Sequence, residues 1–230
     1  MKVGYKLIEK NYFIELDNEN GLKVYTSRVG ASLYAIKYKD TFMLAKPEHT
    51  KDFFDINCLN GKLIENAIKD DPISIKKHGI SFATFDVSNF HNKNGMGAVI
   101  FRLVPKKGYL NLPGNIIYQV AYTIKEDSSD LEVSINAMSS EDCSFDISYS
   151  TPIFLGEGVE KYHNDKKEIV LFNDKFQATI TTDYDEIETY KDENIVNLSF
   201  KDKPGNRTIT KQRELYTRNI RYSFIEKKEP

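Results

Sequence analysis

The sequence predicts an all-β protein, a large antiparallel β-sandwich, and three observations support this prediction. Apolar and polar residues alternate with a period of two in several segments, as they do in strands with one buried and one solvated face. Clusters of turn residues separate these segments at short intervals, which is typical of a sandwich or a barrel. The 230 residues include 14 Phe, 14 Tyr and no Trp, and this aromatic content favours strands over helices.

The alternation is clearest in residues 131–137 (LEVSINA), where every apolar residue is followed by a polar one. Residues 145–150 (FDISYS) repeat the pattern, so both segments are expected to be half-buried strands. Residues 115–124 and 98–104 are richer in apolar side chains and are interpreted as more central strands. Further strands are expected at residues 12–16, 22–26, 31–38, 168–172, 177–181 and 220–225.

Turn signals rich in Asn, Asp, Gly and Pro lie between these segments. They occupy residues 17–21, 92–95, 112–114, 127–130 and 203–206. A parallel sheet would need helical patterns between its strands, and the best of these, near residues 50–55, is short. The acidic residues 183–193 are interpreted as a solvated loop or a sheet edge. Because no repeat, linker or boundary is visible, residues 1–230 are expected to form one domain.

Charge and composition exclude several classes of partner. The chain has 32 basic and 34 acidic residues, a net charge of -2, which gives no electrostatic reason to expect nucleic acid or an anionic membrane. No segment approaches the roughly 18 consecutive apolar residues of a membrane span, and the first residues lack the apolar run of a signal peptide. Two cysteines, Cys58 and Cys143, do not make a disulfide framework. The expectation is a cytoplasmic protein with reduced thiols.

Motifs for metals, nucleotides and nucleophiles are absent from the sequence. The four histidines form no close pair, and there is no CxxC, so no metal site is expected. No GxGxxG, GKS or GKT segment indicates a nucleotide cofactor, and no GxSxG elbow indicates a serine nucleophile. The sequence therefore predicts neither a cofactor nor a metal.

His78 is the remaining candidate for chemistry. Its imidazole can exchange protons near neutral pH, and the following Gly79 allows the backbone to approach a ligand closely. The residues alone favour a surface histidine at a strand end before a turn glycine, with a catalytic histidine as the alternative.

An ordered set of motifs resembles the aldose 1-epimerase (galactose mutarotase) family. Residues 78–82 (HGISF) are similar to the family's H-G-F-x-R segment, and residues 147–154 (ISYSTPIF) fall where the family has S-x-G-x-H-P-x-F. The other matching segments are residues 20–38, 60–66 (NGKLIEN), 115–138 and 209–224. The resemblance runs from near residue 20 to near residue 225. It implies the galactose mutarotase-like supersandwich, a sugar groove on a concave sheet face, and a hexose or related carbohydrate as ligand.

The resemblance also implies site residues. In the family one histidine protonates the ring oxygen, a glutamate removes the anomeric proton, and a second histidine and an arginine hold the sugar. By position His78 matches the supporting histidine, and Lys62 and Phe82 fall where the family has arginines. Thr151 falls at the acid histidine, and a threonine hydroxyl cannot supply a proton near pH 7. The sequence therefore predicts His78 as the catalytic residue, with Lys62, Thr151 and Phe82 contacting the substrate.

The base glutamate has three candidates in the shortened stretch before the closing strands: Glu186, Glu188 and Glu193. With its acid position altered, the chain is expected to be a carbohydrate-binding protein with a degenerate catalytic site, in which aldose 1-epimerase activity is weak or lost. The alternative is an interaction or structural sandwich without a sugar site. The surface around His78 discriminates between them: polar groups converging on an open groove there favour sugar binding, and a groove filled by Phe82 and its neighbours favours the alternative. The sequence leaves the sugar and the oligomeric state open.

Overall fold

The computed structural model describes residues 1–46, 49–50, 80–105, 116–139, 147–203 and 215–227, and the backbone alone of residues 63–65, 143–145 and 208–210. Strands dominate these residues, together with a three-residue 3-10 turn, η1 (Ile80–Phe82). Every strand pairing among them is antiparallel. The predicted all-β antiparallel class is confirmed.

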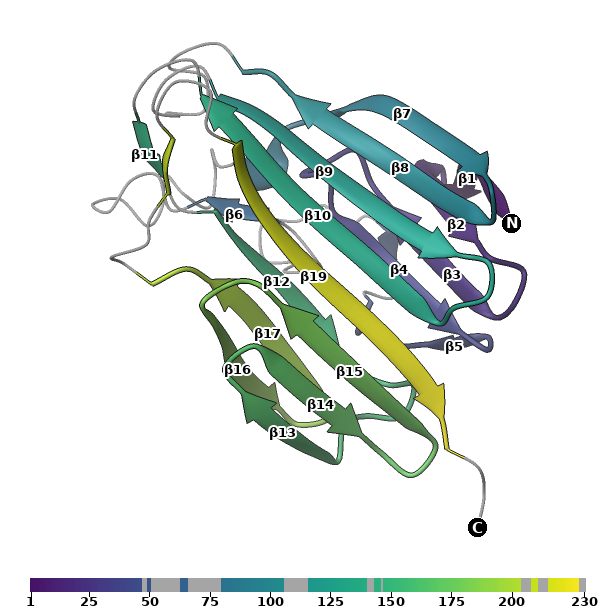
Figure 1. Ribbon diagram of the computed structural model, residues 1–230. Helices are drawn as coiled ribbons and strands as arrows, with labels where there is room; N and C mark the ends of the chain where they lie inside the picture. The colour runs from purple at the N-terminus through teal and green to yellow at the C-terminus, as the bar shows by residue number, and fades with distance from the viewer. Residues whose placement is uncertain are drawn as a thin grey trace.

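An eight-stranded sheet forms one layer of the sandwich (Figure 1). Its strand order is β13-β14-β15-β19-β10-β9-β8-β7, so the last strand of the chain lies in the interior of the sheet. The strands are β7 (Asp86–Lys93), β8 (Met96–Leu103), β9 (Ile116–Lys125), β10 (Asp130–Ser139), β13 (Lys161–Asp165), β14 (Glu168–Phe172), β15 (Phe176–Thr182) and β19 (Leu215–Glu226).

Two smaller sheets form the second layer, behind the eight-stranded sheet in Figure 1. One contains β1 (Lys2–Ile8), β2 (Asn11–Asp17), β3 (Leu22–Thr26), β4 (Leu33–Tyr38) and β5 (Thr41–Phe42), in that order. The other has the order β16-β17-β12-β6, from β16 (Glu186–Asp192), β17 (Ile195–Lys201), β12 (Ile147–Ile153) and β6 (Leu63–Glu65). A bridge between Leu44 and Ile153 joins these two sheets. The strands β11 (Cys143–Phe145) and β18 (Thr208–Thr210) form a separate two-stranded sheet.

The core lies between the two layers. Apolar side chains from both layers form one buried cluster, which includes Val120, Ile135 and Phe224 of the large sheet and Leu16, Val24 and Phe200 of the second layer. The rings of Tyr38 and Phe224 stack across the interface with centroids 6.1 Å apart. The period-two pattern of the sequence thus corresponds to strands whose apolar side faces the other layer.

The predicted strands agree well with the observed ones. Residues 22–26 and 168–172 match β3 and β14 to the residue, and residues 131–137 form the centre of β10. The acidic residues 183–193 contain β16, an edge strand of the four-stranded sheet. The expected helix near residues 50–55 lies almost wholly outside the described residues, as does the turn at residues 112–114.

The expectation for residues 145–150 was wrong in one respect. All seven residues of β12 are buried, including Ser148 and Ser150 on the side expected to face solvent. The strand lies between β17 and β6, and the residues on its outer side are small serines that expose little surface. This strand is therefore not half-solvated, although its residues still alternate between two faces.

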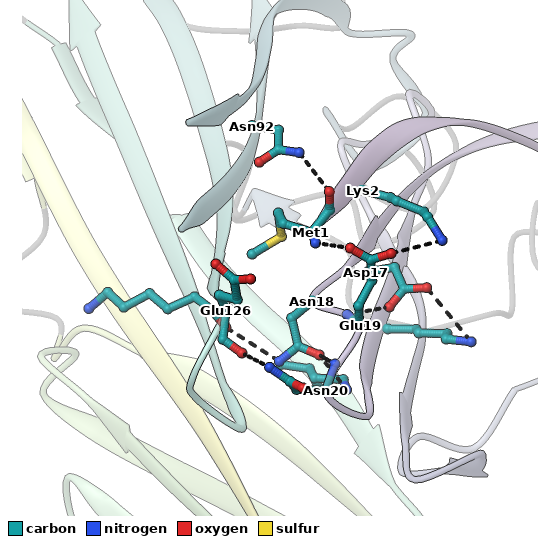
Figure 2. Close-up of polar contacts among 11 residues, drawn as sticks. Met1, Lys2, Asp17, Asn18, Glu19, Asn20, Asn92 and Glu126 are labelled. Carbon is teal, nitrogen blue, oxygen red and sulfur yellow. Dashed lines mark hydrogen bonds and ion pairs between the residues drawn. The ribbon is translucent and has the colours of Figure 1, made fainter. Parts of the chain in front are cut away.

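A buried asparagine ties the two layers together at one end of the sandwich. Asn18, in the β2–β3 turn, donates from Nδ2 to the carbonyl oxygens of Lys125 (3.3 Å) and Ser128 (2.9 Å) around the β9–β10 turn. Its Oδ1 accepts the backbone N–H of Leu22 at 2.9 Å. Nearby, Asn20 donates to the carbonyl of Glu126 at 2.8 Å (Figure 2). The predicted turns at residues 17–21 and 127–130 thus meet in space.

Gly30, in the β3–β4 connection, allows that loop to pack closely against η1. Its backbone has a φ of +64°, and a Cβ at this position would lie 2.4 Å from the carbonyl oxygen of Ser81. Gly30→Ala is therefore expected to lower the free energy of unfolding by about 1–2 kcal/mol from the left-handed backbone alone, as urea denaturation would show. Gly4→Ala is the control because a Cβ there meets nothing within 4 Å. Equal stabilities for the two variants would contradict the close packing at Gly30.

Candidate functional site

Side chains of β12 alternate between the core and the outer face of the four-stranded sheet. Tyr149 faces the core, since its hydroxyl lies 3.3 Å from the hydroxyl of Tyr122 on β9. Thr151, two residues further along, shares this side. Ser148 and Ser150 therefore point the other way, to the face turned away from the eight-stranded sheet.

The outer face of β12, β17 and β16 carries a groove of about 370 Å³. On β17, the buried Val196, Leu198 and Phe200 alternate with partly exposed polar residues on the outer side. Seven side chains on this side define what we call the outer groove: Ser148, Ser150, Glu188, Tyr190, Asn197, Ser199 and Lys201. The volume falls within the range of small-molecule sites.

Strand register arranges these side chains in rows. Ser150 pairs with Ser199, and Ser199 pairs with Glu188, so the three lie side by side across β12, β17 and β16. Asn197 and Tyr190 are opposite each other in the next row. Because neighbouring strands are about 4.8 Å apart, each row places hydrogen-bonding groups across a width similar to that of a sugar ring.

The outer groove combines charge balance, polar groups and one exposed aromatic ring. Lys201 and Glu188 form an ion pair, so the groove presents one cation and one anion in contact. Tyr190 is 67% exposed, leaving its ring available to a ligand. Hydroxyl and amide groups can both donate and accept hydrogen bonds, and these donors and acceptors complement the hydroxyls of a carbohydrate.

Thr151 borders this groove, but its hydroxyl lies on the core side. The residue is 1% exposed, and its Oγ1 is close to the hydroxyl of Tyr222 on β19. Burial raises the pKa of Tyr222 well above its ordinary value, and the Thr151 hydroxyl offsets part of that rise. Neither oxygen has a hydrogen-bond partner of good geometry among the described residues. The side chain at the predicted acid position therefore faces Tyr222 rather than the outer groove.

The other predicted site residues are distributed as follows. Phe82 ends η1, which packs beside β6, and it is not among the residues that line the outer groove. Tyr149, two residues before Thr151, is a core residue. His78 and Lys62 lie outside the described residues, so their places in the site stay predictions.

The structure separates the three candidate glutamates. Glu188 lines the outer groove, whereas Glu193 lies in the β16–β17 turn with a φ of 48°. Glu186 is in register with Lys201 but does not line the groove. Sequence reasoning missed the groove residues of β17, although the alternation in residues 195–201 (IVNLSFK) could have revealed that strand.

Two further observations concern ions and membranes. Within the part of the chain that the structure describes, no group of three or more His, Cys, Asp or Glu residues could hold a metal ion. The same residues contain no helix with the length and apolar character needed to cross a bilayer.

Comparison with solved structures finds this fold in mutarotase-like proteins. The galactose 1-epimerase of Lactobacillus acidophilus NCFM has a TM-score of 0.80 at 12% identity, over 98% of this chain and 99% of its own. A galactose mutarotase-like protein from Clostridium acetobutylicum has a TM-score of 0.76 at 11% identity, and an aldose epimerase homologue from C. elegans has 0.70 at 12%, both over 98% of this chain and 99% of theirs. No family model and no curated protein matches the sequence.

These similarities extend over almost the whole chain. They show that the protein has the galactose mutarotase-like β-sandwich fold, which the sequence motifs predicted. At 11–12% identity the similarity concerns the fold, and function has to be argued from the groove itself.

Proposed function

We propose that the protein binds a hexose or a related carbohydrate in the outer groove and interconverts sugar anomers only slowly. The observation that carries the proposal is the row of Ser150, Ser199 and Glu188 beside the exposed ring of Tyr190. A pyranose has an apolar face, which can stack on an aromatic ring, and a rim of hydroxyls, which can bond to such a row. The fold shared with a galactose 1-epimerase supports a sugar as the ligand class.

The slow rate of anomer interconversion follows from the residue at the acid position. The resemblance places the acid histidine at Thr151, where the hydroxyl is buried on the core side. Among the described residues no histidine lines the outer groove. Loss of a general acid typically removes about two to four orders of magnitude of rate. Brisk loss of optical rotation in freshly dissolved glucose at catalytic protein concentrations would contradict this part of the proposal.

The affinity is expected to be weak. A neutral sugar gains no strong Coulombic attraction from a groove whose cation and anion already pair with each other. Each hydrogen bond contributes only about 0.5–1.5 kcal/mol net, so a dissociation constant of roughly millimolar order is expected.

Replacement of Tyr190 tests this site directly. Tyr190→Ala removes the stacking ring, so we expect affinity for the best-binding hexose to fall by about threefold to tenfold. Titration calorimetry or ligand-observed NMR across a panel of hexoses and hexose phosphates is the measurement. His78→Ala is expected to remove about one hydrogen bond from the same complex.

Tyr12 provides the matched control, because it is 69% exposed, on β2, and outside the groove. Tyr12→Ala should bind sugar as the native protein does. If no sugar of the panel binds, or if Tyr190→Ala and Tyr12→Ala bind equally well, the proposal is wrong. The interaction module without a sugar site then becomes the better explanation of the fold.

A further inference from the structure

The ion pair between Glu188 and Lys201 lies among the residues that line the outer groove. In the β16–β17 register Glu188 is opposite Ser199, while Lys201 is opposite Glu186. Lys201 therefore reaches diagonally along the outer face to contact Glu188, although another carboxylate is its direct neighbour. Long side chains can span such diagonal positions in a sheet. The contact brings a carboxylate and an ammonium together where both line the groove.

Interconversion of anomers by acid–base catalysis uses one group that accepts a proton and one group that donates a proton. A proton must leave the anomeric hydroxyl, and a proton must reach the ring oxygen. Both of these oxygens are bonded to the same carbon, so a base and an acid that line the same groove can each reach one of them. Groups already held in such an arrangement accelerate proton transfer because the entropy of bringing them together is lost in advance.

We propose that Glu188 and Lys201 act as the base and the acid of the slow anomer interconversion, in place of the missing histidine. This inference rests on the proposed function. The Glu188 carboxylate takes the proton of the anomeric hydroxyl, whose oxygen becomes the carbonyl oxygen as the bond between the anomeric carbon and the ring oxygen breaks. The Lys201 ammonium gives a proton to the departing ring oxygen. The open-chain aldehyde rotates about its carbon–carbon bond, and the reverse transfers close the ring and restore both residues.

The pair can be altered without loss of the fold. The side chains of Glu188 and Lys201 are 55% and 37% exposed, and exposed ion pairs contribute little to stability. Lys201→Arg is the decisive variant. Arginine keeps the positive charge and can keep the ion pair, but it does not give up its proton in proteins. The Lys201→Arg variant therefore distinguishes a lysine that donates a proton from a lysine that only positions Glu188.

The experiment is exchange NMR of the glucose and galactose anomers at equilibrium, with sugar binding measured on the same samples. The native protein is expected to raise the exchange rate above that of buffer. Glu188→Gln, Lys201→Met and Lys201→Arg should each lose the protein-dependent rate by about tenfold or more when they are compared with the native protein at equal sugar occupancy, which the binding measurement sets. Circular dichroism of each variant shows that it is folded.

A second exposed ion pair supplies the matched control. Lys175 and Glu157 are 62% and 68% exposed and do not line the groove, so Lys175→Arg and Glu157→Gln should exchange anomers at the native rate. A native rate in Lys201→Arg or in Glu188→Gln would overturn the assignment. A native protein that binds sugar but exchanges anomers at the buffer rate would overturn it too, and would leave the proposed binding function standing. A protein that binds no sugar would overturn both.

Discussion

Alkaline solution is expected to unfold this protein in a narrow range just above pH 10. Four tyrosines that are fully enclosed between the layers, Tyr122, Tyr149, Tyr184 and Tyr222, have pKa values that burial raises above the ordinary value. A tyrosine in the unfolded chain ionises near pH 10. The folded state holds these hydroxyls neutral, so it binds more protons than the unfolded state at high pH, and stability falls as the pH rises.

The size of this effect follows from linkage. The stabilisation that comes from these neutral hydroxyls is fully present below about pH 10. It declines above that pH by about 1.4 kcal/mol per hydroxyl for each pH unit. Four such groups remove about 5 kcal/mol by about pH 11, a large part of the 5–15 kcal/mol typical of a folded domain. With 14 tyrosines and no tryptophan, tyrosinate absorbance reports the titration without interference, and circular dichroism reports the fold.

The ionisation of the four buried tyrosines should coincide with the loss of circular dichroism, because their hydroxyls stay neutral while the fold persists. Tyr222→Phe removes one buried hydroxyl that lacks a good hydrogen bond, and it should move the unfolding midpoint to higher pH. A single smooth titration of all tyrosines with the fold intact would contradict the burial of this group.

Thr151→His, which restores the residue that the family resemblance expects, should destabilise the protein without restoring activity. The side chain at position 151 is directed at Tyr222 in the core, where it is 1% exposed. An imidazole there overpacks the interior and buries a polar ring, at a combined cost of about 2–4 kcal/mol. Thermal or urea unfolding measures the loss, and anomer exchange should stay at or below the native rate.

One substitution at the same position and one at the preceding residue serve as controls for this result. Thr151→Val keeps the shape and removes the unpaired hydroxyl, so its stability should equal or exceed that of the native protein. Ser150→His points into the outer groove and should cost less stability than Thr151→His. A stable Thr151→His variant with brisk anomer exchange would mean that residue 151 faces the groove after all.

Much of the fold could be predicted from the sequence because the core strands obey a simple alternation. Residues 131–137 and 168–172 bury one face each, so their apolar residues recur every second position. Strand β7 was missed since most of its residues are exposed and no apolar pattern marks it. Strand β12 was placed correctly, but its burial depends on neighbours that no local pattern reveals.

The candidate site could be predicted only in part, and strand register is the reason. Glu188 was one of three possible glutamates, and only the pairing of β16 with β17 places it beside Ser199. For Thr151 the motif gave the position along the chain but not the face, because one residue of slip in a strand exchanges the buried and the outer sides. The groove residues of β17 carry no motif, so only the sheet brings them together.

The strand order of the large sheet has a consequence for how the molecule is made. β19 lies between β15 and β10, and its pairing with β10 joins residues as far apart in the chain as Asp130 and Ser223. Until the segment up to Glu226 leaves the ribosome, the sheet consists of two separate halves, each with an unpaired inner edge. Contacts of such long sequence separation also slow folding. The nascent chain is therefore exposed to edge-to-edge association from the completion of β10 until β19 emerges.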